Sequence, residues 1–313
     1  MNISIVNESF LSNEQIKRIK KIGNVDVINT SNKDIIRKLK DTQVLVTDMF
    51  MLNLDDEFFS NLPNLEYVTI NSTGFDRVSI DSATKNNVKV SNVPEYGSDS
   101  VAELAIALMF SVLRNIPQFD KEMRSNPREL DPTDDKTYER MGFNVRGKVL
   151  GVIGLGAVGI RVAEIGQGLG MKVVAYNRSK KLVEGVSNVS FDELLTTSDV
   201  VSLNVPLTVE TKHLISSAEF SKMKKSCILV NTARGGVVDE KALVKALRDN
   251  KVFGAGLDIM EDYNKDNELL KLDNVVITPH IGWLTKEAKN NIGRIILENV
   301  KSFVNGNPTN VVN

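Results

Sequence analysis

Three glycines in Gly154-Leu155-Gly156-Ala157-Val158-Gly159 have the spacing of a turn that can receive a phosphate group. The apolar run from Val149 to Ile153 precedes them, and a helical pattern extending to Gly170 follows. The first glycine would permit a tight turn, the second the approach of a pyrophosphate, and the third close packing of helix on strand. A turn without a ligand is the alternative. The order of strand, turn, helix and next strand favours dinucleotide binding at the helix N-terminus.

The end of the next expected strand, Tyr176-Asn177-Arg178-Ser179-Lys180-Lys181, bears on which dinucleotide would bind. An acid at this place would accept hydrogen bonds from the adenine ribose hydroxyls, and the chain has no acid there. Asn177 and Ser179 could instead donate to a 2'-phosphate. Arg178 and Lys180 could neutralise its charge. A solvated basic turn is the alternative, but we expect NADP(H) to be preferred over NAD(H).

The composition excludes several classes of partner. The 313 residues are 42% hydrophobic and 25% charged, which is typical of a globular chain and not of a disordered or coiled-coil one. A formal net charge of -1 leaves no basic excess for nucleic acid or for an anionic membrane surface. We therefore expect a small-molecule partner, with neither nucleic acid nor membrane.

Cysteine and histidine are scarce. Cys227 stands alone, so we expect no intrachain disulfide, no metal site of the zinc-cluster kind, and a reducing, cytoplasmic setting. The opening MNISIVNESF has no basic region followed by an apolar core, and it is interpreted as a first strand and not a signal peptide. Imidazole chemistry would have to use His213 or His280.

The elements that position these residues alternate between short β-branched runs and helical patterns, which is typical of parallel α/β structure. Strands are expected at 3–6, 25–28, 44–47, 67–70, 88–90, 149–153, 173–176, 200–203, 228–231, 254–258 and 275–278. Ser100 and Glu103 have capping-box spacing, so a long buried helix is expected to begin there. Another helix is expected over about 285–305, ending before Gly306.

One segment is unusually charged. Between Asp120 and Arg140 twelve of the twenty-one residues are charged, and Pro127 and Pro132 interrupt any regular element. This pattern favours an exposed loop with a helical turn, and an arm or partner surface is the alternative. A chain of this length is expected to form two domains.

Seven motifs occur in an order that resembles the D-isomer-specific 2-hydroxyacid dehydrogenases, and together they cover essentially the whole chain. They are Asn71-Ser72-Thr73-Gly74-Phe75-Asp76, Asn92-Val93-Pro94 with Ser100-Val101-Ala102-Glu103, the glycine turn, Asn204-Val205-Pro206-Leu207-Thr208, Asn231-Thr232-Ala233-Arg234-Gly235-Gly236, Leu257-Asp258 and Thr278-Pro279-His280-Ile281-Gly282. Tyr96-Gly97-Ser98-Asp99-Ser100, together with Trp283, looks most like the glycerate dehydrogenase, hydroxypyruvate reductase and glyoxylate reductase branch.

The resemblance implies an architecture. It implies two doubly wound parallel-sheet α/β domains, with a Rossmann-type cofactor domain inserted into a flavodoxin-like substrate domain. Residues 1–97 and 285–313 would form the substrate domain, and 98–284 the cofactor domain, with two long helices as connectors. The active site would lie in the cleft between the domains, and the chain would form a homodimer through the cofactor domain.

The resemblance also implies roles for site residues. Arg234 would hold the substrate carboxylate and polarise the neighbouring carbonyl. His280 would be the acid in reduction and the base in oxidation, whereas His213, in a charged stretch, would be structural. The remaining substrate-binding residues would be Phe50, Met51, Thr73, Gly74 and Trp283. Cofactor contacts would come from Val101, Gly154, Leu155, Gly156, Ala157, Val158, Gly159, Asn177, Arg178, Ser179, Lys180, Val205, Pro206, Thr211, Thr232, Ala233, Asp258, His280 and Gly282.

One departure from the family pattern concerns the partner of His280. Relatives carry a Glu five residues after the Asp of the strand end, and it raises the pKa of the histidine. Here Tyr263 occupies that place. A shifted local alignment would put Glu261 or Asp262 beside the imidazole instead. If Tyr263 is the partner, it offers only a neutral hydrogen bond, and His280 loses the attraction that favours its charged form.

The expected function is an NADPH-dependent reduction of small 2-oxo acids, of the glyoxylate or hydroxypyruvate type, to D-2-hydroxy acids. Arg77 is the one cation close to the two expected substrate loops, those of Phe50 and Thr73. A phosphorylated substrate, which would need more positive charge, is therefore disfavoured. The alternative is a dinucleotide-responsive regulatory protein on the same scaffold, with weak catalysis. Retention of Arg234 and His280 argues against that alternative.

Overall fold

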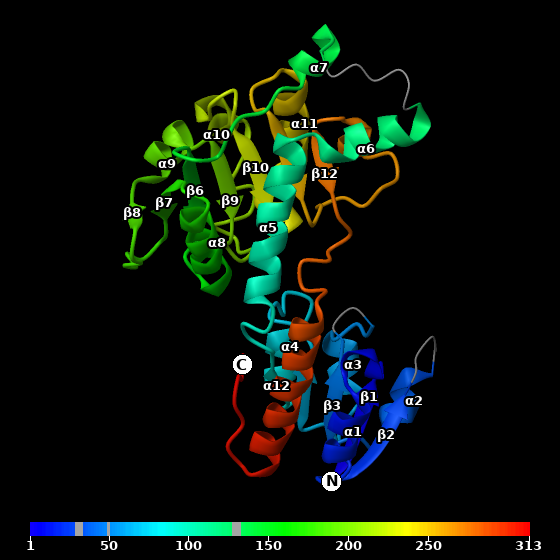
Figure 1. The fold of residues 1–313 in the computed structure, drawn as a ribbon. Coiled ribbons are helices and arrows are strands. Elements are labelled where there is room, and N and C mark those ends of the chain that lie inside the picture. Colours follow the sequence, from blue (N-terminus) through cyan, green and yellow to red (C-terminus); the bar gives the residue numbers. More distant parts are fainter. Residues whose placement is uncertain (29–33, 49–50, 127–132) are drawn as a thin grey trace. The chain divides into compact units, whose positions relative to one another are not determined.

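The computed structural model describes residues 1–28, 34–48, 51–126 and 133–313 (Figure 1). The chain divides into two compact units, each with its own parallel sheet. Unit 1 consists of Met1–Gly97 and Leu284–Asn313, and unit 2 of the intervening Ser98–Trp283. The first unit is therefore built from both ends of the sequence.

Unit 1 is a five-stranded parallel sheet in the order β2-β1-β3-β4-β5, which is the flavodoxin-like order. Its strands are β1 (Asn2–Val6), β2 (Asn24–Ile28), β3 (Val44–Thr47), β4 (Tyr67–Ile70) and β5 (Lys89–Ser91). Its helices are η1 (Glu8–Phe10), α1 (Asn13–Ile19), α2 (Ile35–Leu39), α3 (Asp56–Ser60), α4 (Ile80–Lys85) and α12 (Lys286–Val304). All residues of β3 and β4 are buried, as expected for a parallel sheet covered on both faces.

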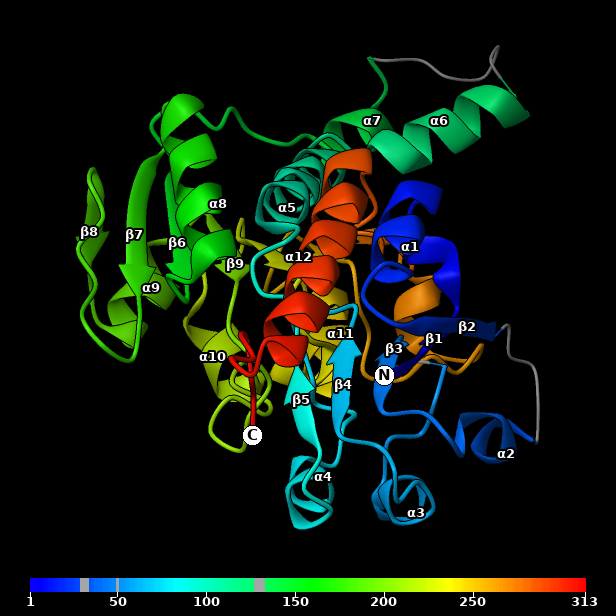
Figure 2. The ribbon, with the colours of Figure 1, turned by 90° about the horizontal axis from the view of Figure 1, so that it is seen from below.

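The last residues of the chain complete unit 1. Helix α12 lies beside α1 and along β4 (Figure 2), and the ring of Phe303 stacks on that of Tyr67 with centroids 4.3 Å apart. The side chain of the fully buried Asn299 donates to the hydroxyl of Thr69 and to the carbonyl of Asn92. Beyond the helix, Val311 forms an antiparallel bridge with Ser91 of β5.

Unit 2 is a seven-stranded parallel sheet in the order β12-β11-β10-β9-β6-β7-β8, which is the Rossmann order with one further strand. Its strands are β6 (Val149–Ile153), β7 (Lys172–Tyr176), β8 (Val186–Asn188), β9 (Val200–Leu203), β10 (Ile228–Asn231), β11 (Gly254–Leu257) and β12 (Val275–Ile277). Its helices are α5 (Ser98–Leu113), α6 (Ile116–Ser125), α7 (Asp135–Glu139), α8 (Ala157–Gly168), α9 (Phe191–Thr197), α10 (Ser217–Lys222), η2 (Gly235–Val237), α11 (Glu240–Arg248) and η3 (Glu268–Lys271). The two sheets confirm the predicted α/β fold.

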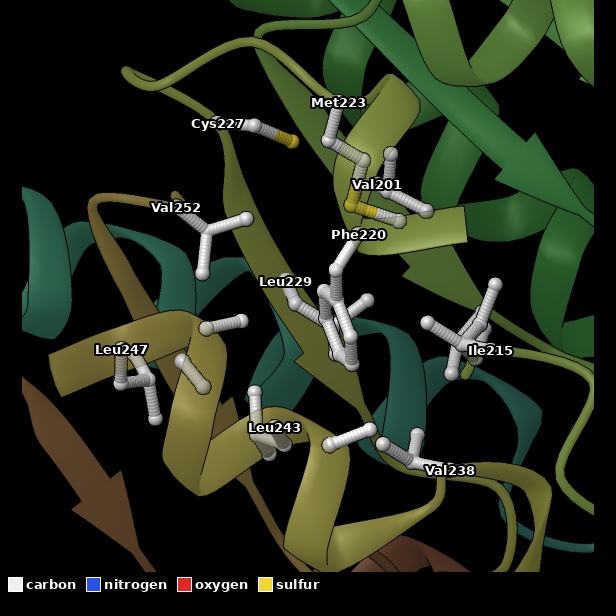
Figure 3. Close-up of a cluster of buried hydrophobic side chains, with 14 of the residues drawn as sticks. Val201, Ile215, Phe220, Met223, Cys227, Leu229, Val238, Leu243, Leu247 and Val252 are labelled. Atoms are coloured by element: carbon white, nitrogen blue, oxygen red, sulfur yellow. The ribbon is translucent and has the colours of Figure 1, made fainter. Parts of the chain in front are cut away.

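The core of unit 2 lies on both faces of this sheet. On one face Phe220 of α10 and Leu243 of α11 pack on Leu229 of β10 (Figure 3). On the other face the buried residues of α5, among them Leu108, pack against β10 and β11. Gly256 of β11 permits that approach, since a Cβ there would lie 2.8 Å from Leu108 Cβ.

Three local predictions were wrong. Helix α5 begins at Ser98, so Ser100 lies inside it and is not a cap. The short edge strand β8 was missed, because two of its three residues are exposed and polar. The charged segment is more helical than expected, since α6 and α7 occupy much of it, while 127–132 lie outside the described residues. None of the described helices alone is long and apolar enough to cross a membrane; α5 and α6 pass that test only when joined across a 59° bend.

Candidate active site

Arg234, Asp258 and His280 follow three neighbouring strands at one edge of the unit 2 sheet. Arg234 lies beyond β10, Asp258 directly beyond β11, and His280 beyond β12. Asn231 is in register with Leu257, and Leu257 with Ile277, so Arg234 and His280 occupy equivalent places past their strands. The strands that carry them are two spacings apart, roughly 10 Å, which long side chains can bridge through a small acid. Ligands bind at this carboxyl edge in open α/β sheets.

The turn that carries Arg234 is fixed by Asn231, the last residue of β10. The buried amide of Asn231 donates to the carbonyl of Arg234 at 2.9 Å and accepts from the amide of Ala233 at 3.0 Å. Arg234 is the N-cap of η2 and has extended backbone angles. A guanidinium nitrogen of Arg234 donates to the carbonyl of Ala233.

The turn that carries His280 is organised by Asp258. Its carboxylate, 1% exposed, accepts from the Thr278 hydroxyl at 2.6 Å and from the amides of Ile281 and Gly282 at 2.9 and 2.8 Å. The amide of His280 donates to the carbonyl of Asp258, and His280 has a positive φ of 57°. Asp258 was expected to contact a cofactor, and its contacts in the structure are those of a support for the histidine turn.

The glycine turn fits a diphosphate. Gly154 has a φ of 94°, which favours glycine, and a Cβ at Gly159 would overlap the carbonyl of Gly154. Gly156, the N-cap of α8, differs from both, because a Cβ there would meet no atom within 4 Å. The second glycine therefore faces open space at a helix N-terminus, where amides and the helix dipole favour an anion.

The basic turn after β7 is tied to the glycine turn at Leu155. The side chain of Asn177 accepts from the Leu155 amide at 3.0 Å and donates to the carbonyl of Ser179 at 2.6 Å. The ammonium of Lys181 donates to the Leu155 carbonyl at 3.1 Å. Asn177, expected to reach a 2'-phosphate, therefore braces the turn, whose cations are Arg178, Lys180 and Lys181.

Other expected cofactor residues lie at the same carboxyl edge. The hydroxyl of Thr232, directly after β10, is buried and has no hydrogen-bond partner among the described residues. Its orphaned oxygen fits a polar ligand at this edge. Thr211 closes the loop after β9 by donating to the carbonyl of Pro206. Val101 of α5 would touch a Cβ built on Gly282 at 3.4 Å, so these two pack together.

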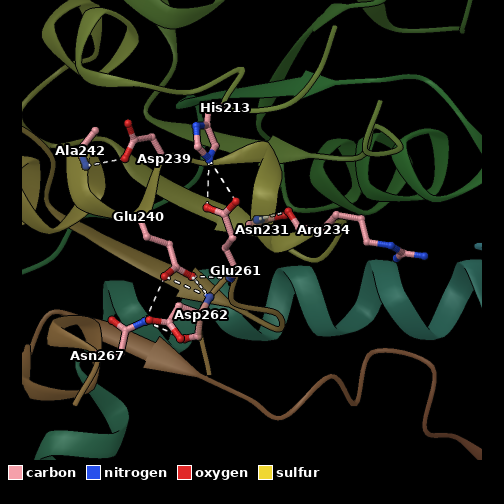
Figure 4. A network of polar contacts seen from close by, with 9 residues as sticks. All are labelled: His213, Asn231, Arg234, Asp239, Glu240, Ala242, Glu261, Asp262 and Asn267. Carbon is pink, nitrogen blue, oxygen red and sulfur yellow. Dashed lines mark hydrogen bonds and ion pairs between the residues drawn. The ribbon is translucent and has the colours of Figure 1, made fainter. Parts of the chain in front are cut away.

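The candidate partners of His280 have contacts of their own (Figure 4). Both carboxylate oxygens of Glu261 lie near Nε2 of His213, at 3.0 and 3.2 Å. The phenol oxygen of Tyr263 accepts from the amide of Met260 at 3.3 Å, and the side chain is exposed. The link between His213 and Glu261 spans 48 positions, and sequence reasoning, which treated His213 as structural, did not find its partner.

The expected substrate residues of unit 1 follow β3 and β4. Phe50 lies outside the described residues, and Met51 is half exposed. The Thr73 hydroxyl donates to the carbonyl of Val93, and Asn92 donates to the carbonyl of Thr73. The loop of Thr73 and Gly74 is thus tied to the segment after β5. Trp283, the last residue of unit 2, is half-buried.

The sheet order, the glycine turn and the residues at the carboxyl edge define a dinucleotide-binding dehydrogenase-type domain. Residues 106–282 match the family model of the D-isomer specific 2-hydroxyacid dehydrogenase NAD-binding domain. The chain therefore belongs to the D-isomer-specific 2-hydroxyacid dehydrogenases, and it is an α/β oxidoreductase with a nicotinamide dinucleotide site.

Individual relatives agree with this assignment. The chain is 38% identical over 287 residues to a glyoxylate reductase of Thermococcus litoralis, covering 89% of this chain and 86% of the relative. It is 41% identical over 312 residues to a D-3-phosphoglycerate dehydrogenase of Archaeoglobus fulgidus, covering 97% of this chain and 58% of the relative. Among solved structures, an acyclic imino acid reductase, Bsp5, in complex with NADPH and D-Arg superposes over both full chains with a TM-score of 0.90 and 32% identity.

Proposed function

We propose that the chain reduces small 2-oxo acids of the glyoxylate and hydroxypyruvate type to D-2-hydroxy acids with NADPH. The observation that carries this proposal is the placement of Arg234 and His280 past β10 and β12, at the sheet edge that also bears the glycine turn. When bound, NADPH would supply a hydride to the carbonyl carbon of the oxo acid.

Each residue has a chemical task. Arg234 binds the carboxylate in a bidentate manner and polarises the adjacent carbonyl. His280 gives its proton to the alkoxide oxygen that develops, and takes it back in the oxidation direction. Trp283, the last residue of the same unit, would border the bound acid.

The preference for NADPH is supported by the charge of the turn after β7. Arg178 and Lys180 can pair with a 2'-phosphate, and the turn carries no acid for the ribose hydroxyls. The NADPH complex of the similar imino acid reductase is in line with this preference. A substrate without a phosphate group is favoured, because Arg77 is the one cation close in sequence to the loops of Phe50 and Thr73.

Steady-state kinetics test the proposal. A panel of glyoxylate, hydroxypyruvate, pyruvate and 3-phosphohydroxypyruvate is followed by NADPH absorbance, with NADH in parallel. We expect turnover on the first two, a lower KM for NADPH than for NADH, and loss of turnover in His280→Ala and Arg234→Gln with cofactor binding retained. Arg178→Ala should raise the KM for NADPH by about 10-fold, as expected for loss of a charge-assisted contact. Arg248→Ala, on the surface of unit 2, is the control.

Two further expectations follow from the same unit. We propose a homodimer formed through unit 2, supported by the exposed apolar side chains of Ile116, Met123, Tyr138 and Met141 in and beside α6 and α7. Light scattering of the eluting protein should give twice the mass of 34.6 kDa.

The buried Cys227 fits a cytoplasmic setting, in which a thiol stays reduced.

A further inference from the structure

The segment after β11 packs directly on the turn that carries Arg234. A Cβ at Gly235 would overlap the backbone of Met260 and the amide nitrogen of Glu261. At Gly236 a Cβ would come within 3.5 Å of a carboxylate oxygen of Glu261. These glycines directly follow Arg234. The backbone of Met260 and Glu261 is therefore packed against the turn that carries Arg234.

The carboxylates of Glu240 and Glu261 hold this backbone segment in place. The carboxylate of Glu240, the first residue of α11, accepts from the backbone amides of Glu261 and Asp262 and from the side-chain amide of Asn267 (Figure 4). One carboxylate thus gathers three donors from a single loop, and charge-assisted hydrogen bonds of this kind are about twice as strong as neutral ones. Glu240 therefore ties the loop to the first residue of α11.

Glu261 ties the same loop to His213, which in turn bonds to η2. Its carboxylate binds Nε2 of His213 at 3.0 Å, and the amide of His213 donates to the carbonyl of Gly236 at 2.8 Å. His213 has a φ of 51°, in the left-handed region that is uncommon for residues other than glycine. Gly236, two residues after Arg234, is therefore in contact with both His213 and Glu261.

We propose that Glu261, together with His213 and Glu240, is a positioning residue for Arg234. The three fix the backbone of residues 260–262 against Gly235 and Gly236, and this sets the direction in which the guanidinium leaves the turn. Figure 4 shows the guanidinium pointing away from the His213–Glu261 pair, so the pair acts through the backbone and does not touch the substrate. The inference rests on the proposed role of Arg234 toward a 2-oxo acid.

This assignment differs in its consequences from Glu261 as the proton partner of His280. A positioning carboxylate can be replaced by an amide, because Glu261→Gln keeps an oxygen that accepts from His213. A partner that stabilises a charged imidazole needs the negative charge, so Glu261→Gln would lower kcat and displace its pH profile. Glu261→Ala removes the contact under either assignment.

The experiment compares Glu261→Ala, Glu261→Gln and Glu240→Gln with the unchanged protein. We expect Glu261→Ala to raise the KM for glyoxylate by about 10-fold, because a displacement of about 1 Å at a binding group costs that much or more. The KM for NADPH should change less than 2-fold, and Glu261→Gln should restore most of the glyoxylate affinity with an unshifted pH profile of kcat. Glu240→Gln should resemble Glu261→Ala, since the two oxygens of Glu240 accept from different donors and the glutamine would turn an NH2 group toward one of them.

Glu268→Ala is the matched control. Glu268 is also a glutamate of unit 2, ion-paired to Arg248 at 2.8 Å, and the KM values of its variant should stay those of the unchanged protein. A lowered melting temperature in Glu261→Ala without any rise in the KM for glyoxylate would overturn the positioning role, as would loss of kcat with a shifted profile in Glu261→Gln. If the unchanged protein turns over no 2-oxo acid, the proposed function fails first and takes this inference with it.

Discussion

The carbonyl oxygen of Asp258 accepts a hydrogen bond from the backbone amide of His280 at 2.8 Å. The carboxylate of the same aspartate binds the amides of the two residues that follow the histidine. A buried acid thus shapes the turn of the candidate acid–base catalyst from the neighbouring strand, and the orientation of the imidazole depends on a residue that need not meet the substrate.

Removal of this support should damage both stability and activity. In Asp258→Ala two amides and a hydroxyl lose a charged acceptor in a buried place, so we expect the free energy of unfolding to fall by about 3 kcal/mol. Because the His280 turn is released, kcat/KM for glyoxylate should fall by at least about 100-fold. Urea titration and steady-state kinetics check both. Asp273→Ala, at an exposed site before β12, should change neither, and an active Asp258→Ala would contradict the role.

Gly156→Ala separates cofactor binding from folding. A Cβ at Gly156 meets no protein atom, so the variant should fold with an unchanged melting temperature. The added methyl group would occupy the approach of the pyrophosphate, and we expect the Kd for NADPH, measured by fluorescence titration, to rise by more than about 10-fold. Gly168→Ala is equally unhindered and lies at the other end of α8, so it should bind NADPH normally. Equal affinities in the two variants would refute the diphosphate site.

Asn177→Asp should weaken NADPH binding selectively. The substitution keeps the acceptor for the Leu155 amide but places a negative oxygen against the Ser179 carbonyl and beside the expected 2'-phosphate. We expect the KM for NADPH to rise by about 10-fold or more and that for NADH to change less than about 3-fold. Asn274→Asp, whose amide also donates to a carbonyl but before β12, is the control. A parallel rise for both cofactors would mean that the turn only shapes the loop.

Cys227 makes folding sensitive to alkaline pH. Burial, and secondly the charge of Asp199, raise the pKa of the Cys227 thiol from 9.0 to about 12. The unfolded chain ionises above pH 9 whereas the folded one does not, so this stabilising contribution is present below pH 9 and is lost as the pH rises toward 12. Between pH 9 and 11 the free energy of unfolding should fall less steeply in Cys227→Ala than in the unchanged protein. The two slopes should differ by up to about 1.4 kcal/mol per pH unit.

The same burial predicts an unreactive thiol. Ellman's reagent at pH 8 should find no accessible thiol in the native protein and one after denaturation, because the thiolate is the reactive form. Rapid native reaction would show that the cysteine is reached through local opening.

Patterns that act over a few residues were predictable from the sequence. Val149–Ile153 and Ile228–Asn231 were found as strands because parallel strands buried on both faces are continuous apolar runs. The glycine turn was found because its spacing carries its geometry. The start of α5 at Ser98 was misplaced by two residues, since capping-box spacing also occurs inside helices.

Contacts between distant residues were not predictable. The pair of His213 and Glu261, the three donors on Glu240 and the support of His280 by Asp258 join segments that meet only once the sheet of unit 2 has formed. A single sequence gives the residue types at these positions and the strands that precede them. It does not give which of their side chains come into contact. Asn299, a buried polar residue of α12, was placed on the correct helix without its partners Thr69 and Asn92.

The discontinuity of unit 1 also bears on protein synthesis. A ribosome makes Met1–Gly97 before the other part of unit 1, and the helix that covers β4 and stacks on Tyr67 belongs to residues 284–313. The earliest segment must therefore wait, with apolar surface uncovered, while the contiguous Ser98–Trp283 emerges and can complete its own core. During synthesis residues 1–97 are therefore expected to need chaperone protection, whereas residues 98–283 are not.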